Sequence, residues 1–317
     1  MDSTAQRSQA PARQRDKAQE RTKDRVTARA ASKKAMTQTS EPGAQSNRRR
    51  NPNKPYNDID LSQWKDYDHV LTDSLWMMES RTKRDGHQLD YHGNFIPQIA
   101  NQMMLRYTKA GDTILDYFLG SGTTAIEAHN LGRKCIGVEL QSRMADYVQT
   151  KLSELGACET SQVIVGDSAD LQWTGGKISQ ALRAWEQEAG QFAFLHPPYD
   201  DIIKFSENEQ CLSNAESTEA FLDGFERVCQ QAYNFLEKGR FACLVIGDKY
   251  ANSELIPLGF YCMERMMRVG FKNKSIVVKN MTGNEKGKGK TANLWRYRAL
   301  AGGFYIFKHE YVMVFQK

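Results

Sequence analysis

Residues 113–124 read Thr-Ile-Leu-Asp-Tyr-Phe-Leu-Gly-Ser-Gly-Thr-Thr and decide the fold class of this 317-residue chain. The short apolar run at 113–118 is typical of a buried strand, and a glycine-rich turn ends it. The residues that follow, 123–131, have the pattern of a helix. A strand, a tight turn and a helix in this order predict one unit of an α/β sheet.

The rest of the folded part continues to alternate between strands and helices. Further strands are predicted at 134–139, 162–166, 192–195, 241–246 and 275–279, with a final strand pair or one long bent strand over 304–307 and 311–315. Further helices are predicted at 142–155, 219–236 and 260–269. This alternation predicts a doubly wound, mostly parallel sheet of seven strands, whose ligands bind outside the carboxyl ends of the strands.

Composition excludes several classes of protein. Of the residues, 40% are hydrophobic, which is enough for a substantial core. No apolar run approaches the roughly 18 residues of a membrane helix, and the N-terminus lacks the pattern of a secretory signal. The six cysteines form no Cys-x-x-Cys pair, which argues against a zinc site and a disulfide framework. We therefore expect a cytoplasmic protein without a bound metal.

Charge is divided unevenly along the chain. Residues 1–55 carry 14 Lys and Arg against 5 Asp and Glu, whereas the rest carries 29 against 33. The first segment has few large apolar side chains to offset chain entropy, so we predict a disordered basic tail over 1–57 and one folded domain over 58–317. The tail is interpreted either as an arm that contacts nucleic-acid phosphates through Arg48, Arg49 and Arg50, or as a solvated tail.

Three carboxylates stand at the ends of successive predicted strands, beside the glycine-rich turn. Gly120 and Gly122 allow the backbone to approach a ligand, although a Gly-x-Gly alone is also an ordinary tight turn. Glu139 is placed to accept hydrogen bonds from the hydroxyls of a ribose. Asp167 could accept a hydrogen bond from an adenine amine, and Asp116 could pair with an ammonium group. Each acid alone could be a helix cap or loop carboxylate. Three together favour a cationic adenosine derivative over a dinucleotide pyrophosphate.

The fourth predicted strand ends in His196-Pro197-Pro198-Tyr199. The two prolines stiffen the loop and present Tyr199 on a rigid support, where its ring can stack on an extruded base. His196 and the proline carbonyls can accept hydrogen bonds from an exocyclic amine. The alternative is a structural turn with Tyr199 in the core. The place of the loop after the fourth strand favours a site.

These two motifs together resemble those of the amino-methylating DNA methyltransferases, which transfer a methyl group from S-adenosylmethionine to N6 of adenine or N4 of cytosine. The resemblance covers about residues 75–317, nearly all of the folded part. It includes 91–98, which is similar to the N-terminal cofactor motif of the family, and 311–315, which is similar to its last strand. The order of motifs, cofactor turn first, is similar to the gamma arrangement. The resemblance implies a Rossmann-like class I methyltransferase domain.

The resemblance also implies the roles of individual residues. S-adenosylmethionine would be bound by Phe95, Asp116, Phe118, Gly120, Gly122, Thr123, Thr124, Glu139, Asp167 and Ser168. Catalysis would be positioning by His196, Pro197, Pro198 and Tyr199. His196 stands where the family has Asp, Asn or Ser; a neutral histidine can accept a hydrogen bond but carries no negative charge. Adenine N6 is the expected target because it is commoner in the family, and cytosine N4 is the alternative.

Two small insertions, at about 200–217 and 281–302, are candidates for target recognition. In the second, Lys286, Lys288 and Lys290 are interpreted as phosphate contacts and Arg296 or Arg298 as base readers, against the alternative of a solvated loop. About 260 folded residues leave little room for a separate recognition domain. We therefore expect a short target sequence.

Two other functions fit the same residues. One is methylation of RNA bases or of a protein amide on the same fold, and the other is a catalytically inactive nucleic-acid binder. Double-stranded DNA is the expected partner, and a cognate restriction enzyme is a candidate second partner. The chain is expected as a monomer or homodimer on the nucleoid of a bacterial, phage or mobile-element host.

Overall fold

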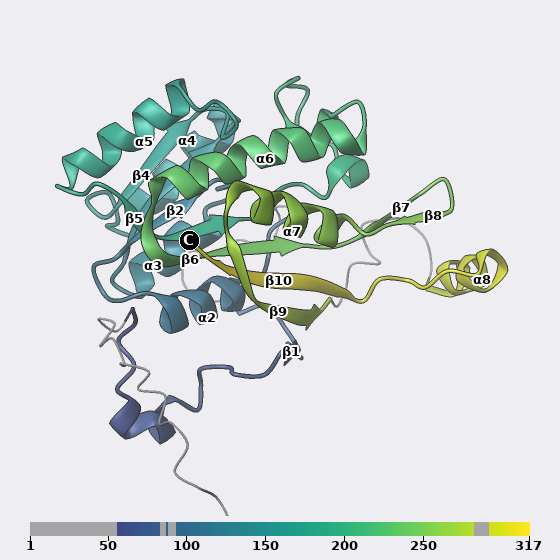
Figure 1. Cartoon of the computed structure of the whole chain (residues 1–317), viewed down its shortest axis with the longest axis horizontal. Coiled ribbons are helices and arrows are strands. Elements are labelled where there is room, and N and C mark those ends of the chain that lie inside the picture. Colours follow the sequence, from purple (N-terminus) through teal and green to yellow (C-terminus); the bar gives the residue numbers. More distant parts are fainter. Residues whose placement is uncertain (1–55, 83–86, 88–92, 282–291) are drawn as a thin grey trace, which may run out of the picture. The chain divides into compact units, whose positions relative to one another are not determined.

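The structure is a computed structural model and describes residues 56–82, 87, 93–281 and 292–317 (Figure 1). Most of the predicted tail over 1–57 lies outside these residues, but its last two belong to the fold. The ring centroid of Tyr56 lies 4.8 Å from that of Phe241, and the Asn57 side-chain amide donates to the carbonyl of Arg106. The described fold therefore begins two residues before the predicted boundary.

The main sheet has eight strands in the order β1-β9-β10-β6-β5-β2-β3-β4. Their bounds are β1 Leu75–Trp76, β2 Thr113–Asp116, β3 Lys134–Glu139, β4 Ser161–Val165, β5 Gly190–Leu195, β6 Leu236–Ile246, β9 Lys272–Asn280 and β10 His309–Gln316. Only β10 is antiparallel to its neighbours in this sheet. The predicted mostly parallel sheet is confirmed; the two-residue β1, which pairs with the edge of β9, makes eight strands instead of seven.

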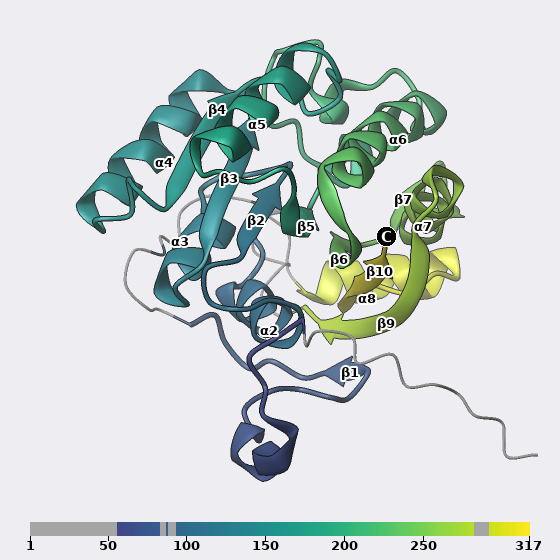
Figure 2. The same ribbon diagram turned by 60° about the vertical axis from the view of Figure 1, so that its left-hand side comes forward.

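Helices cover both faces of the sheet, as a doubly wound fold requires (Figure 2). On one face lie α2 (Pro97–Tyr107), α3 (Thr123–Asn130) and α4 (Ser142–Glu154). On the other lie α5 (Trp173–Ala184), α6 (Thr218–Phe235) and α7 (Leu258–Val269). Adjacent residues of one strand supply the two cores: Ile114 packs under the first layer and Leu115 under the second.

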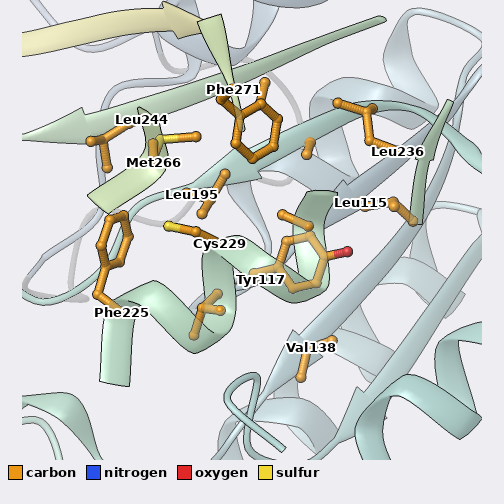
Figure 3. Close-up of a cluster of buried hydrophobic side chains, with 14 of the residues drawn as sticks. Leu115, Tyr117, Val138, Leu195, Phe225, Cys229, Leu236, Leu244, Met266 and Phe271 are labelled. Carbon is orange, nitrogen blue, oxygen red and sulfur yellow. The ribbon is translucent and has the colours of Figure 1, made fainter. Parts of the chain in front are cut away.

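The second core shows why α6 forms where its apolar spacing predicts. Phe225 and Cys229, one helical turn apart, both point at the sheet and meet Leu195 and Leu244 there (Figure 3). The side chain of Ser217 caps this helix by accepting from the amide of Ala220. The result is a rigid layer directly behind the carboxyl ends of β5 and β6.

Smaller elements complete the fold. The 3₁₀ helices are η1 (Leu61–Tyr67), η2 (Asp200–Ile202) and η3 (Leu212–Asn214), and β7 (Lys249–Ala251) pairs with β8 (Glu254–Ile256) in a hairpin. Helix α8 spans Ala292–Gly302. The predicted strand at 304–307 is wrong. Phe304 and Phe307 pack instead around the ring of Tyr250 on the hairpin, so only the second predicted segment, 311–315, forms a strand, β10.

The topology brings several connections to one edge of the sheet. Strand β5 is parallel to β2 and β6, so their carboxyl ends share an edge. Strands β6 and β9 each pair antiparallel with β10, so β9 ends at that edge too. The hairpin β7–β8 follows β6, and α8 lies between β9 and β10, beyond the sheet (Figure 1). No helix in the described ranges is long and apolar enough to cross a membrane.

Candidate active site

A cavity of about 650 Å³ lies at the shared carboxyl edge. The glycine turn after β2 and the loop after β5 both contribute to its wall. The predicted site residues that line it are Phe95, Phe118, Gly120, Thr123, Glu139, Asp167, Ser168, His196, Pro197, Pro198 and Tyr199. The structure therefore brings the two sequence motifs, some 75 residues apart along the chain, into one cavity.

Three predicted cofactor residues, Asp116, Gly122 and Thr124, lie behind the wall and shape the turn instead. Asp116 is 2% exposed, and its carboxylate accepts from the backbone N–H of Phe118 at 2.9 Å. Gly122 has φ +83°, and a Cβ there would lie 2.7 Å from a methyl group of Val148. The expectation that Asp116 meets a ligand ammonium directly is thus corrected, because the turn folds over this carboxylate.

Burial raises the pKa of two acids in the cavity wall and of one acid behind it. It is the main cause that raises the pKa values of Glu139 and Asp167, which line the cavity, and it raises the pKa of Asp116 behind them to about 6. Glu139 Oε2 accepts from the N–H of Gly120 at 2.9 Å, which ties the end of β3 to the glycine turn. A cationic ligand in this cavity would stabilise the ionised carboxylates.

Aromatic side chains frame the cavity beside the loop after β5. The Phe95 ring stacks on Phe194 with centroids 5.2 Å apart and meets the His196 ring edge-on at 5.1 Å. Ser121 Oγ donates to the Asn94 side chain at 2.5 Å, which fastens the segment before α2 to the glycine turn. Phe95 is thereby held between the two motifs.

His196 is neutral at physiological pH. Burial lowers its pKa to about 4; the negative charge of Glu310 opposes this shift, and the positive charge of Lys279 adds to it. A neutral imidazole has one ring nitrogen that accepts hydrogen bonds. The side chain can therefore act as an acceptor for an amine, as the sequence predicts, although it lacks the charge of an aspartate.

Sequence reasoning missed several residues of the wall. Lys279 and Glu310 line the cavity as a buried ion pair, and Arg81 donates to the Phe95 carbonyl at 3.0 Å from the side near α2. A signal was present for Glu310, the one acidic residue in the mostly apolar strand β10. Phe205, in the loop after η2, closes over Gly93, where a Cβ would lie 2.7 Å from its ring.

Two of the residues predicted to hold nucleic acid are described. Arg296 and Arg298 are exposed residues of α8 and do not line the cavity. The others, Arg48, Arg49, Arg50, Lys286, Lys288 and Lys290, fall outside the described residues. Part of the other predicted insertion, 200–217, lines the cavity itself through Ile202, Phe205 and Leu212. In the described ranges, no group of three or more His, Cys, Asp or Glu is placed to hold a metal.

The fold and this site define a class: a Rossmann-like α/β domain with an acidic ligand cavity at the carboxyl ends of its strands. A family model described as DNA methylase, of the N6/N4 type, matches residues 6–150, a segment that holds the glycine turn and Glu139 but ends before His196. This match covers 145 of the 317 residues, a little under half of the chain. S-adenosylmethionine is the cofactor that this likeness implies, and the acidic wall fits its cationic sulfonium group.

Parts of the chain are also similar to curated proteins. The probable type III restriction-modification enzyme HindVI Mod subunit of Haemophilus influenzae is 29% identical over 164 residues, 50% of this chain and 19% of that protein. Type II methyltransferase M.MjaII of Methanocaldococcus jannaschii is 29% identical over 98 residues, which are 31% of this chain and 18% of that protein. The tRNA (guanine(10)-N2)-dimethyltransferase of Methanothermobacter thermautotrophicus is 36% identical over 83 residues, which are 26% of this chain and 24% of that protein. The chain thus spans about a fifth to a quarter of the length of these relatives.

Proposed function

We propose that this protein methylates the exocyclic amine of a base flipped out of double-stranded DNA, with S-adenosylmethionine as donor. The observation that carries the proposal is the single cavity whose wall contains both the glycine turn with its acids and the His196–Tyr199 loop. The match of residues 6–150 to a DNA methylase family model supports it. The chemistry needs the donor and the amine side by side, which one shared cavity permits.

The donor half of the cavity lies over β2, β3 and β4. Glu139 would accept hydrogen bonds from the ribose and Asp167 from the adenine amine, while Phe95 and Phe118 supply apolar cover. When bound, S-adenosylmethionine supplies a methyl group already activated by the positive charge on sulfur. The chain's own task is therefore to orient the donor and exclude water, and the buried position of these carboxylates suits both.

The acceptor half lies at the end of β5. His196 and the Pro197 carbonyl would accept the two amine hydrogens, drawing the amine lone pair out of conjugation with the ring. Tyr199 would stack on the base. With a pKa of about 4, His196 is uncharged at neutral pH, so one of its two ring nitrogens can accept a hydrogen bond. We propose N6 of adenine as the target, the commoner one in the family, with N4 of cytosine as the alternative.

We further propose that the segment 281–302 holds the DNA. It carries one acid, Glu285, against five Lys and Arg, whereas 200–217 carries five acids against Lys204 alone. Phosphate contacts require positive charge, so 281–302 is the better candidate of the two. Its described part, α8, lies beyond the cavity edge of the sheet (Figure 1). The basic segment 1–55 would add phosphate contacts.

Methyl incorporation tests the proposed function. Labelled S-adenosylmethionine is supplied with unmethylated duplex DNA, transfer RNA or a protein mixture, and the proposal expects label in the DNA. The transfer-RNA-modifying relative makes RNA the second candidate, and preferential labelling of RNA would establish it instead. Calorimetric titration with S-adenosylmethionine separates both from an inactive binder, which would give no binding heat. The restriction-modification relatives make a cognate restriction enzyme the proposed partner.

A further inference from the structure

We propose that Glu310, balanced by Lys279, is a positioning residue that fixes the ring of Tyr199 in the base-binding half of the cavity. This inference deepens the proposed function and rests on it. Neither residue belongs to the glycine turn or to the His196–Tyr199 loop. Both come from the last two strands to join the sheet along the chain, β9 and β10.

The strand register places the pair. Glu310 and Lys279 are direct partners in the antiparallel pairing of β10 with β9, so their side chains project from the same face of the sheet. The Lys279 ammonium donates to Glu310 Oε1 at 2.8 Å, and each side chain is only 7% exposed. Both line the cavity.

The second oxygen of the same carboxylate holds Tyr199. The tyrosine hydroxyl donates to Glu310 Oε2 at 2.8 Å, so Glu310 links the loop after β5 to a strand more than 100 residues further along the chain. The ring also lies close to Gly247, where a Cβ would come within 3.0 Å of Cε2. Both the hydroxyl and the ring of Tyr199 thus have close neighbours.

The chain just after Tyr199 is held as well. Asp200 has φ +53°, an uncommon conformation for a residue with a side chain. Its buried carboxylate pairs with the Lys249 ammonium at 2.6 Å and accepts from the Thr218 hydroxyl at 2.8 Å. These contacts fix the exit of the loop, while Glu310 fixes the aromatic side chain itself.

Stability alone does not explain a buried Lys279–Glu310 pair. Desolvating two charges costs about as much as their attraction returns, and apolar residues of similar volume often replace such pairs without loss. A base-stacking ring, in contrast, gains from a fixed orientation, since positioning lowers the barrier for transfer. The pair therefore points to a requirement for an oxygen acceptor at the Tyr199 hydroxyl.

A matched pair of double variants isolates that acceptor. Lys279→Met/Glu310→Gln removes both charges but keeps an oxygen for Tyr199, and Lys279→Met/Glu310→Leu removes the oxygen as well. Neither leaves an unpaired buried charge, so both are expected to fold, as thermal unfolding would verify. We expect the Leu variant to lose about tenfold or more in kcat for methyl transfer relative to the Gln variant. The dissociation constant for S-adenosylmethionine should be the same in both.

A third substitution closes the cycle. Tyr199→Phe keeps the ring but removes the hydroxyl, so it should slow the wild type and have no further effect in the Leu double variant. Equal kcat in the Gln and Leu variants would overturn the positioning role. So would the same fold-loss in kcat from Tyr199→Phe in the wild type and in the Leu double variant. A matching loss of donor affinity in the Leu variant would also overturn it, because the defect would then be general.

A readout independent of activity separates this inference from the proposed function. In crystal structures of the three proteins, the Tyr199 ring should keep one orientation in the wild type and the Gln variant and should turn away or be disordered in the Leu variant. The same ring orientation in all three would contradict the inference. If the wild type methylates transfer RNA instead of DNA, the proposed DNA activity fails, whereas the variant comparison proceeds on that substrate.

Discussion

His196 shows how one residue's chemistry is set by others. The half-buried ring lies edge-on to Phe95, and the opposing charges of Glu310 and Lys279 leave desolvation as the main influence on its pKa. The ring is therefore uncharged, whereas an aspartate in its place would be negative. In the proposed mechanism, the site then relies on geometry more than on charge to prepare the amine for attack.

Replacement of His196 tests this reading. His196→Ala should lower the rate of methyl transfer by about 100-fold or more, because the amine loses a preorganised hydrogen-bond partner. The affinity for S-adenosylmethionine should stay unchanged. His196→Asn, which restores an oxygen acceptor, should retain measurable transfer. Rates with labelled donor and calorimetry on the same preparations would check both. Full activity in His196→Ala would remove this residue from the mechanism.

Asp116 makes a prediction about pH. Its pKa is about 6 in the folded protein against 3.8 as the ordinary value, so the folded state binds this proton more tightly and stability falls as pH rises from about 4 to 6. The buried ionised carboxylate then costs about 3 kcal/mol at neutral pH. Asp116→Asn keeps an acceptor for the Phe118 amide without that cost.

The comparison is made without added donor. Urea unfolding of the wild type and Asp116→Asn at several pH values should show a stability difference that grows in favour of the variant between pH 4 and 6 and then levels off. Other titrating groups cancel because both proteins share them. A difference that does not change with pH would mean that the burial of Asp116 does not shift its pKa.

Residue by residue, the donor half of the site was predictable and the acceptor half only in part. Gly120, Glu139 and Asp167 stand at strand ends that local patterns mark, so their convergence follows from parallel topology alone. Glu310 and Lys279 meet Tyr199 only through the register of two antiparallel strands. That register is not encoded in any local pattern of the sequence.

At the scale of elements, the glycine turn depends on its fit against α4. Gly122 has φ +83° and a Cβ there would touch Val148, whereas Gly111 has φ +82° and a Cβ there would meet nothing within 4 Å. The two glycines thus share a backbone conformation and differ in packing. Substitution at Gly111 therefore serves as a control for substitution at Gly122.

Gly122→Ala should therefore destabilise the protein by more than Gly111→Ala. We expect about 1 kcal/mol for the backbone term at Gly111 and about 1–3 kcal/mol more at Gly122 from overpacking. Chemical denaturation measures both. Equal losses would show that Val148 moves aside freely and that the turn is not held by α4.

Helix α5 was missed for a physical reason. Its first turn contains Gly175 and Gly176, which disfavour a helix by local propensity. A Cβ at Gly175 would lie 2.9 Å from Gln231 Oε1 on α6, so the two helices pack closely at this glycine. Tertiary contact here overrides propensity, whereas α6 itself, with a regular apolar stripe, was predictable within a residue at each end.

At the scale of the whole molecule, α8 and α5 lie at opposite ends of the sheet, which provides a control for DNA binding. Arg296 on α8 and Arg183 on α5 are both exposed arginines. If α8 contacts DNA, Arg296→Ala should weaken binding to methylatable duplex by about tenfold, within the range of one lost arginine contact. Arg183→Ala should leave it within about twofold. Equal effects in fluorescence anisotropy at one fixed salt concentration would exclude α8 as the specific contact.

Sequence patterns could predict the α/β fold and the edge of the sheet that holds the cavity. Both follow from the alternation of strands and helices along the chain, which local apolar spacing indicates. The patterns could not place α8, since its position depends on β9 and β6 both pairing antiparallel with β10. The aromatic packing of Phe304 and Phe307 on Tyr250 likewise joins segments about 50 residues apart.

Mass spectrometry of nucleosides tests the central claim most directly. Unmethylated duplex DNA is incubated with the protein and S-adenosylmethionine carrying a deuterated methyl group, then digested and analysed. Label on N6 of adenine, or else on N4 of cytosine, is the predicted result, and His196→Ala should eliminate it. Label on a ring carbon, or unlabelled DNA beside labelled RNA, would contradict the account.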